Sequence, residues 1–296
     1  MGTVTDGRDD VVGERRHLIN LAYRLLGSVA EAEDAVQEAY ARWYALSRER
    51  RAAVDRPGAW LTTVATRVCL DQLGSARARR ERYVGEWIPE PLPDPTEWAG
   101  DPADRITLDE SVNMAFLVVL EAMTPAERVA FVLHDVFRYP FPEVAAMVGR
   151  SPAACRQLAT SARRRLRTAA PGPAPAPAPA GLVRAFKRAW EARDIDALVS
   201  LLAPDATLVA DGGGLAGALL RPLRGATRIA DYLLFIATKA PDLTLLERTV
   251  NGTPGLVART SGHTVTVAAF DTTPAGVTRI WAVRNPEKLG PWQTEG

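Results

Sequence analysis

The chain has 296 residues, of which 47% are hydrophobic and 24% are charged, and its formal net charge is +1. This length predicts about two domains with hydrophobic cores, and the composition excludes a chain that is mostly disordered. The near-neutral charge excludes a global positive field, so any contact with DNA must come from local basic clusters or from a partner that supplies phosphate contacts.

The first predicted module, residues 14–84, is helical. Residues 28–31 (SVAE) have the spacing of a capping box at the start of a helix. Polar residues Asp34, Gln37 and Glu38 share the outer face of that helix. The opposite, apolar face comprises Ala32, Ala35, Val36, Ala39, Tyr40 and Trp43.

A further helix is predicted to begin near Pro57 and to run into the basic cluster 77–82. Its apolar positions predict one buried face, and its hydroxyl and arginine side chains predict an outer face that suits a nucleic-acid backbone. A solvated face remains an equal alternative for this helix in isolation. The expected buried residues are Leu61, Val64, Ala65 and Val68, and the expected exposed ones are Thr62, Thr63, Thr66, Arg67 and Asp71.

An inter-module linker is predicted over residues 85–108, and it contains the proline-rich stretch 87–95 (WIPEPLPDP). Proline favours an extended backbone. A simple spacer has no need of apolar anchors, so we expect this linker to dock against another part of the protein. The anchors are Trp87, Ile88, Leu92 and Trp98.

Residues 109–168 have the pattern of a helix-turn-helix module. Thr124 and Pro125 predict an N-cap and a first-turn proline, and Pro142 is predicted to open a second helix. Gly149 is placed to end that helix with a positive φ, and the pair 151–152 (SP) is predicted to cap a third helix. The buried stripe of the third helix is predicted to contain Leu158, Ala159, Ala162 and Leu166.

The polar face of this third helix predicts DNA contact. Arg156 and Gln157 lie in its N-terminal turns, where arginine reads guanine and glutamine reads adenine in the major groove. Ser161 and the arginines 163–165 lie farther along the same face, and the arginines are placed to hold phosphates. The alternative is a solvated basic face on an ordinary helical hairpin.

A second linker, residues 169–180, alternates Pro and Ala and predicts an extended spacer. The last module, residues 181–296, begins with helices predicted over 182–192 and 195–202. A run of strands follows, which indicates an α+β domain with a curved antiparallel sheet. The strand candidates are 206–210, 245–250, 256–260, 265–270 and 277–283.

Cysteine and histidine usage predicts no metal or redox site. Cys69 and Cys155 fall in helices of different modules and are expected to be reduced and structural. His17, His134 and His263 are scattered along the chain. The N-terminal segment is polar, and no apolar run approaches the length of a membrane span. We therefore expect a cytoplasmic protein without a metal or cofactor.

With both helical modules in view, the chain resembles a bacterial sigma factor of the extracytoplasmic function (ECF) type over residues 15–82 and 109–167. The segment AEDAVQEAYARWYAL resembles the helix that binds the clamp of core RNA polymerase. The segment RPGAWLTTVATRVCLDQL resembles the helix that reads the melted downstream promoter element, and the helix-turn-helix resembles the reader of the upstream element. Core RNA polymerase and promoter DNA are thus the expected partners.

The resemblance implies roles for particular residues. Asp34, Gln37 and Glu38 match the polar core-binding positions. The implied upstream contacts are Arg156 and Gln157 on bases, with Ser161, Arg163 and Arg164 beside them, the last two on phosphates. The implied downstream contacts are Trp60, Thr62, Thr63 and Arg67. Trp60 is left open between stacking on an unpaired base and simple core packing.

The last module resembles a SnoaL-like domain of the nuclear-transport-factor-2-like fold, a cone-shaped α+β architecture. An ECF group carries this extension, and three motifs link the chain to that group: the linker motif WIPEPL, the motif DGGG and the motif NPEKL. The resemblance implies a regulator in cis, with an intramolecular contact between the motifs. Leu215 departs from the group, which usually has a basic residue there. The implied interface comprises Trp87, Pro89, Leu92, Asp211, Gly212, Gly213, Gly214, Asn285, Pro286, Lys288 and Leu289.

Two other functions are compatible with parts of the sequence. Related folds host enzymes with an acid and a base in an apolar pocket, for which Asp211, Asp231 and His263 are the candidates here. Asp211 precedes three glycines and His263 lies in a predicted hairpin turn, so we expect no catalysis, and binding of a small ligand is the better expectation. A one-component regulator would dimerise on a palindrome without polymerase and would leave residues 15–82 unexplained.

Overall fold

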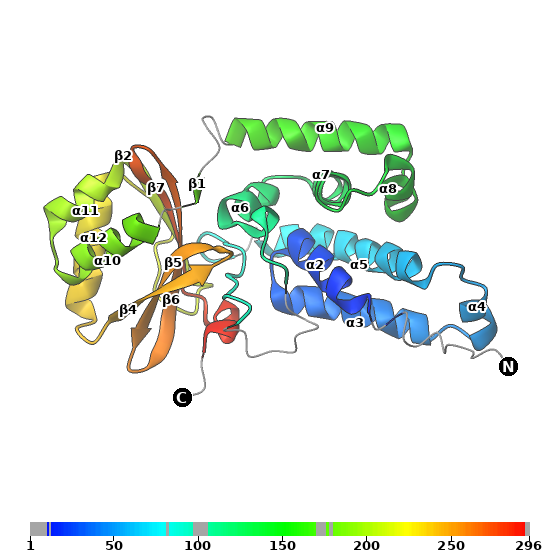
Figure 1. The fold of residues 1–296 in the computed structure, drawn as a ribbon, viewed down its shortest axis with the longest axis horizontal. Coiled ribbons are helices and arrows are strands. Elements are labelled where there is room, and N and C mark those ends of the chain that lie inside the picture. Colours follow the sequence, from blue (N-terminus) through cyan, green and yellow to red (C-terminus); the bar gives the residue numbers. More distant parts are fainter. Residues whose placement is uncertain are drawn as a thin grey trace. The chain divides into compact units, whose positions relative to one another are not determined.

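The computed structural model describes residues 11, 13–80, 83–96, 106–169, 176–177 and 180–293 (Figure 1). The chain forms two compact units. The helical unit contains residues 1–79, 100–107 and 119–169, and the C-terminal unit contains residues 80–99, 108–118 and 170–296. Most of both predicted helical modules therefore belongs to one unit, whereas most of the linker 85–108 and the start of the second module, residues 109–118, belong to the other. This division differs from the linear one expected from sequence, because compactness follows tertiary contacts and not chain order.

The first part of the helical unit folds as expected from its caps and apolar stripes. Gly27 ends the first helix with a left-handed φ of 74°, and the Ser28 side chain caps the next by accepting from the Glu31 amide at 3.4 Å. The long helix α5 begins at the expected Pro57. These elements are α2 (Arg15–Leu26), α3 (Val29–Tyr44), α4 (Arg48–Ala52) and α5 (Pro57–Arg80).

The helix-turn-helix is also present. Thr124 and Glu127 form a full capping box, and Gly149 ends the second helix with a φ of 71°. That helix begins at Phe141, one residue before the expected Pro142. The elements are η2 (Glu110–Val112), α6 (Met114–Glu121), α7 (Pro125–Phe131), a π-helical turn η3 (Val132–Val136), α8 (Phe141–Val148) and α9 (Pro152–Ala169).

The C-terminal unit has the α+β composition that the sequence predicts. Its helices are α10 (Ala180–Glu191), α11 (Ile195–Leu201) and α12 (Ala226–Lys239), with short turns η4 (Pro286–Lys288) and η5 (Gly290–Trp292). Its strands are β1 (Ala176–Pro177), β2 (Leu202–Asp211), β3 (Leu223–Arg224), β4 (Thr244–Val250), β5 (Thr253–Thr260), β6 (His263–Thr273) and β7 (Gly276–Val283).

The described sheet is mixed: the expected antiparallel arrangement is found in every pairing except that of β2 with β7. The strand order is β3-β2-β7-β6-β5-β4, and β1 pairs with β6. Strands β4 to β7 form an antiparallel meander, but β7 lies parallel to β2, with Leu208 opposite Ile280 and Asp211 opposite Val283. The chain between β2 and β7, which includes α12 and strands β3 to β6, brings β7 back beside β2 in the same direction. Turn signals alone do not reveal such a non-local pairing.

Helix α12 was not expected from the sequence, where the whole segment after residue 205 was interpreted as β-like. A helical signal is present, because Ala226, Ile229, Ala230 and Leu233 have the i, i+3, i+4, i+7 spacing of one buried face. Three of these side chains are at most 4% exposed. The many strand-forming residues around the segment obscured this period.

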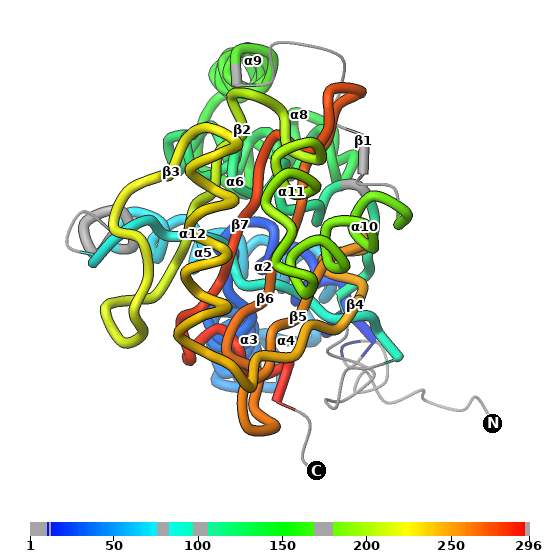
Figure 2. The backbone as a smooth tube through the Cα atoms, turned by 90° about the vertical axis from the view of Figure 1, so that its left-hand side faces the viewer, coloured from blue at the N-terminus to red at the C-terminus, as the bar shows by residue number. Residues whose placement is uncertain are grey.

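The two faces of the sheet are covered differently. Helices α10, α11 and α12 lie across one face (Figure 2), where they pack on alternate strand residues such as Phe270 and Ile280. The intervening residues, among them Val267 and Trp281, point to the other face. There they pack against Ile88 of the linker, Met114, Leu289 and Trp292. The linker thus docks through Ile88 on one face of the C-terminal sheet, whereas the expected anchor Trp98 lies outside the described residues.

No helix in the described ranges combines the length and the apolar character that a membrane span requires.

Candidate functional surfaces

The outer face of α3 carries the expected polar residues. Asp34, Gln37 and Glu38 are exposed, and the opposite stripe of the helix is buried. Glu38 accepts a hydrogen bond from Arg42 Nε at 2.8 Å, with both side chains about half exposed. Such an exposed pair one helical turn apart is weak and is readily exchanged for another partner. The face is therefore an accessible acidic surface.

Helix α5 is covered on more sides than its pattern predicted. Thr62 and Thr66 were expected to be exposed, but they are 2% and 0% exposed. The Thr62 hydroxyl donates to the Gly58 carbonyl at 2.9 Å and the half-buried Thr63 hydroxyl to the Ala59 carbonyl at 2.8 Å, the backbone bonds that threonine makes inside helices. The half-buried Trp60 packs its ring 5.2 Å from that of Trp43.

Arg67 lies between the two helical modules. Its Nε donates to the Met147 carbonyl at 3.1 Å and its Nη2 to the Ala146 carbonyl at 3.1 Å. Both carbonyls belong to the last turn of α8, the negative end of the helix dipole, where a guanidinium is favoured. A second contact joins His17 Nε2 and the Tyr139 hydroxyl at 2.9 Å. Burial lowers the pKa of His17 below its usual value, and Glu14 partly opposes this shift.

The outer face of α9 has two parts. Arg156 and Gln157 are exposed, as expected, and the Arg156 guanidinium lies 5.8 Å from the centre of the Phe141 ring. Arg163, expected on phosphates, forms a two-pronged ion pair with Asp135, with distances of 2.8 Å and 3.1 Å. This pair ties α9 to the π-helical turn η3.

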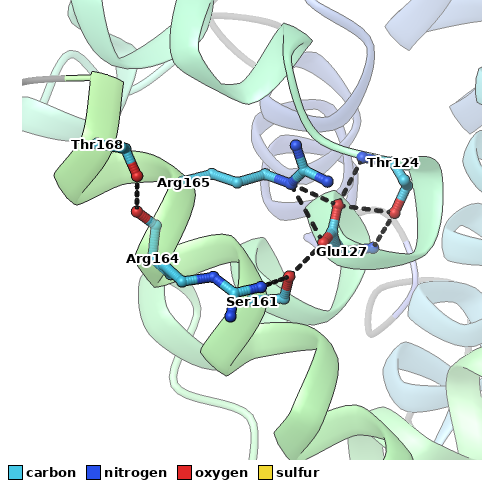
Figure 3. Close-up of polar contacts among 6 residues, drawn as sticks. All are labelled: Thr124, Glu127, Ser161, Arg164, Arg165 and Thr168. Carbon is cyan, nitrogen blue, oxygen red and sulfur yellow. Dashed lines mark hydrogen bonds and ion pairs between the residues drawn. The ribbon is translucent and has the colours of Figure 1, made fainter.

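Glu127 is the centre of a polar network that joins α7 to α9 (Figure 3). One carboxylate oxygen accepts from the Ser161 hydroxyl at 2.6 Å, and the other accepts from both the amide and the hydroxyl of Thr124 at 2.9 Å. Arg165 Nε lies 3.2 Å away, and Arg164 donates to the Ser161 hydroxyl at 3.4 Å. Ser161 therefore supports the fold of the module as well as lying on its predicted DNA face.

The pKa of Glu127 reflects this network. Burial alone would raise it, but the hydrogen bonds from Ser161 and Thr124 and the contact with Arg165 lower the pKa to about 2. The sequence pattern had placed Arg165 among the phosphate-binding arginines and had given no role to Glu127. The capping-box spacing of Thr124 and Glu127 was the available signal.

The linker docks on a buried carboxylate, Asp211, which is 0% exposed. One oxygen accepts from the Tyr83 hydroxyl at 2.6 Å and from the Gly213 amide at 3.0 Å. The other accepts from the Ile88 amide at 2.9 Å and from Lys288 Nζ at 2.7 Å. Each oxygen thus has two donors, which come from the linker, the glycine turn and the C-terminal tail.

Lys288 completes this arrangement from the tail. Its ammonium donates to the Ile88 carbonyl at 2.6 Å and lies 4.0 Å from the centre of the Trp87 indole, a cation–π distance. Asn285 donates to the Tyr83 hydroxyl at 2.9 Å. Burial, followed by the hydrogen bond to Asp211, raises the pKa of Tyr83. We call Tyr83, Asp211, Asn285 and Lys288 the linker cradle.

The three glycines after Asp211 are explained by close approaches. A Cβ on Gly212 would lie 2.2 Å from the Ala216 carbonyl oxygen, and one on Gly213, whose φ is 62°, would lie 2.5 Å from Asn285 Nδ2. Gly214 also has a positive φ, of 74°. The turn therefore requires glycine both for its backbone conformation and for its contact with the cradle.

A second clamp holds the linker farther along, and the sequence analysis did not predict it. Asn251 exchanges two hydrogen bonds with the backbone of Leu92, at 2.9 Å and 3.1 Å, and donates to the Val112 carbonyl at 2.8 Å. The Trp292 indole donates to the Pro91 carbonyl at 2.8 Å. Asn251 and Gly252 form an Asn-Gly turn, and such a local turn signal does not indicate what the Asn251 side chain holds.

The predicted interface residues are thus gathered in one place, with Pro89, Leu92 and Leu289 buried beside the cradle. The candidate catalytic residues are not gathered. Asp211 belongs to the cradle, while Asp231 and His263 are exposed, and neither lines the apolar cavity between the helices and the sheet. Among the described residues there is no cluster of His, Cys, Asp and Glu with the geometry to hold a metal ion.

Comparison with known proteins assigns both helical modules. Residues 11–79 match the family model of Sigma-70 region 2, and residues 113–166 match that of Sigma-70 region 4. The chain is 38% identical over 288 residues to the ECF RNA polymerase sigma factor SigJ of Mycobacterium tuberculosis, which covers 93% of this chain and 90% of that protein. The probable ECF RNA polymerase sigma factor SigI of the same species is 34% identical over 288 residues, with 95% and 94% covered.

The crystal structure of Mycobacterium tuberculosis SigJ matches with a TM-score of 0.75 at 35% identity, and the match covers 95% of this chain and 97% of that one. Such coverage includes the α+β part, so the C-terminal unit has a counterpart in SigJ. Similarity at this level over nearly the whole length of both chains shows that the protein belongs to the ECF RNA polymerase sigma factor family.

Proposed function

We propose that the chain directs promoter-specific transcription initiation as a sigma factor that binds core RNA polymerase, and that its C-terminal unit controls this activity through the linker. Two sigma regions in the expected order, within a chain related to SigJ over its whole length, support the first part. The linker cradle supports the second. A one-component regulator is not favoured, because it has no use for the region 2 module.

The outer face of α3 is proposed to bind the polymerase. Asp34 and Glu38 offer exposed carboxylates to arginines of the core enzyme, and Gln37 lies between them. Changing Asp34 and Glu38 to Lys should weaken association with purified core polymerase by about tenfold or more, because like charges then face each other. Circular dichroism should be unchanged, since neither side chain is buried.

A matched control is Glu191→Lys with Asp205→Lys, which changes the charge equally on exposed positions of the C-terminal unit. Glu191 also forms a pair one helical turn away, with Lys187, as Glu38 does with Arg42. Core binding that survives the α3 substitutions, or that falls equally in the control, would contradict this assignment.

Helix α9 is proposed to read the upstream promoter element. Arg156→Ala should cost about 1–3 kcal/mol and relax base preference at one position, because Arg156 and Gln157 are exposed where base edges are read. Arg164→Ala should weaken all sequences alike and reduce the salt slope by about one. The same uniform loss for both variants in a promoter library would argue against base reading.

Helix α5 is proposed to contact the downstream element through Arg67 and Thr63, beside Trp60. Thr62 is buried and contributes to the fold of the helix. Arg67 must break its hydrogen bonds to the Ala146 and Met147 carbonyls before its guanidinium can bind the downstream DNA. Arg67→Lys, which keeps the charge and loses the two-pronged geometry, should therefore change promoter opening and the packing of the helical unit together.

The cradle is proposed to set activity by holding the linker between the two DNA-reading modules. Deletion from Asn285 onward should change transcription from a cognate promoter several-fold without abolishing core binding. Trp87→Ala should shift activity in the same direction, because it loses the contact with Lys288 from the linker side. Asp205→Ala, an exposed acid in the same unit, is the control. Equal transcription by all four proteins at matched concentration would show that the extension has no regulatory role.

A further inference from the structure

The C-terminal unit contains a cavity of about 310 Å³ between the helices and the sheet, on the side away from the linker. Its wall is almost entirely apolar and is formed by α10, α12 and strands β2 and β4–β7. Aromatic side chains contribute on the helical side, among them Phe186 and Trp190. A cavity of this size is at the lower end of the range that binds small organic ligands.

Tyr232 and Arg284 give one part of the cavity wall a polar character. A shallower hollow adjoins the cavity and shares Tyr232, Ile236, Ala240 and Arg284 with it. Lys239 also lines this hollow and lies 5.6 Å from the centre of the half-exposed Phe235 ring. Among the described residues that line the two hollows, none is a carboxylate or a histidine. The entrance is therefore cationic and the interior is apolar.

Arg284 is incompletely satisfied. One terminal nitrogen donates to the Gly217 carbonyl, but Nε is buried and has no hydrogen-bond partner. A buried guanidinium nitrogen without an acceptor is costly, and an anionic ligand would supply that acceptor. Burial raises the pKa of Tyr232 at the same wall, and Arg284 opposes the shift. Tyr232 therefore stays protonated and can donate a second hydrogen bond.

We propose that this cavity binds a small amphiphilic carboxylate, with its hydrocarbon chain between α10, α12 and the sheet and its carboxylate on Arg284 at the entrance, near Lys239. The site binds without turnover, since its described lining contains no carboxylate or histidine that could act as a general base. Its position is separate from the linker cradle, although the backbone amide of Arg284 donates to the Asp211 carbonyl at 2.7 Å.

The probes are hexanoate, octanoate and decanoate, with decanol as the neutral and decylamine as the cationic analogue, titrated calorimetrically into the full-length protein below their micelle-forming concentrations. Affinity should rise about fourfold per methylene until the cavity is filled. Decanol should bind about tenfold or more weakly than decanoate, the effect of a charge-assisted hydrogen bond. Decylamine should not bind measurably.

Variants locate the site. Arg284→Gln combined with Lys239→Gln should remove the preference for decanoate over decanol, and Arg284→Lys should keep most of it. Ala282→Phe, which fills the cavity beside Arg284, should abolish binding of both probes. Each variant is first checked for a wild-type circular dichroism spectrum. Equal binding of decanoate and decanol to the wild type, a preference that survives the double variant, or no binding of decanoate would overturn the proposal.

Discussion

Each of the two units of this sigma factor contains a buried carboxylate at the centre of a hydrogen-bond network. The two carboxylates differ in how exposed their ionic partners are. Asp211 in the C-terminal unit is 0% exposed, and its ionic partner Lys288 has a side chain that is 8% exposed. Glu127 in the helical unit has a side chain that is 7% exposed, but its ionic partner Arg165 is 46% exposed. Both carboxylates join segments that are distant in sequence, yet only the Asp211 pair lies wholly out of water.

This difference has a physical consequence. A charge pair removed from water is costly to break, because the remaining partner is left buried and unpaired. A pair with one partner in solvent is screened, and it can exchange for another anion, such as a phosphate, at little cost. The linker is thus held by an ion pair that is costly to break. The ion pair of the helix-turn-helix network can exchange partners, which suits a surface that is proposed to bind DNA.

The largest expected effect is at the cradle. Lys288→Met leaves the Asp211 carboxylate buried beside an apolar side chain and should destabilise the C-terminal unit by about 3–5 kcal/mol. Urea unfolding monitored by tryptophan fluorescence measures this loss. Asp211→Asn combined with Lys288→Met should recover part of it, since no charge then remains buried.

Lys187→Met is the matched control for Lys288→Met. Lys187 pairs with Glu191 at 2.8 Å one helical turn away, and its change should cost about 0–1 kcal/mol. If the Lys187 and Lys288 variants lose similar stability, the contrast between buried and screened pairs is wrong.

The glycine turn should show the next largest effect. Gly213→Ala places a Cβ at a φ of 62° against Asn285 and should cost about 1–3 kcal/mol. Gly217→Ala, in the same loop, meets nothing within 4 Å and has no positive φ, so its stability should be close to wild type. Thermal unfolding of the two variants measures this difference. Equal midpoints would show that close contact with the linker cradle does not explain the glycines of the DGGG motif.

The helix-turn-helix network should respond to acid. The pKa of Glu127 is lowered from an ordinary value of 4.5 to about 2, so its ionised form stabilises the folded state above pH 4.5. That stabilisation should be lost as the pH falls from 4.5 toward 2. Glu127→Gln should lower the free energy of unfolding by about 1–2 kcal/mol at neutral pH. The difference in this free energy between the variant and the wild type should become smaller as the pH falls through this window. A difference that is constant with pH would show that ionisation of Glu127 is unimportant.

The smallest effect is expected on α3. Glu38→Gln removes an exposed pair with Arg42 and should change stability by only about 0.3–0.5 kcal/mol. The free energies of unfolding of the wild type and of Glu38→Gln should differ at low salt and become equal at high salt, because salt screens the Glu38–Arg42 pair in the wild type. A larger loss that persists at high salt would mean that Glu38 has a structural role, which would weaken its assignment to the polymerase surface.

The sequence by itself determined the local features of this protein. Helix starts at Ser28, Pro57 and Thr124 and the helix end at Gly149 follow from side-chain capping and from the conformational freedom of glycine, which are properties of a few neighbouring residues. The exposed faces of α3 and the first turns of α9 were predicted for the same reason: helical periodicity separates polar from apolar positions. The apolar linker also indicated that it must dock, because a spacer does not need Trp87 or Leu92.

Only the tertiary structure decided which surfaces meet. Thr62 and Thr66 are buried because α5 is covered on more than one side, and a single helix pattern cannot report what packs against its second face. The parallel pairing of β2 with β7 joins residues that lie about seventy positions apart in the sequence. No local sequence pattern indicates such a pairing. The partners of Arg67, the clamp at Asn251 and three of the four donors to Asp211 come from distant segments, and hydrogen bonds of this kind are chosen by the fold that brings the groups together.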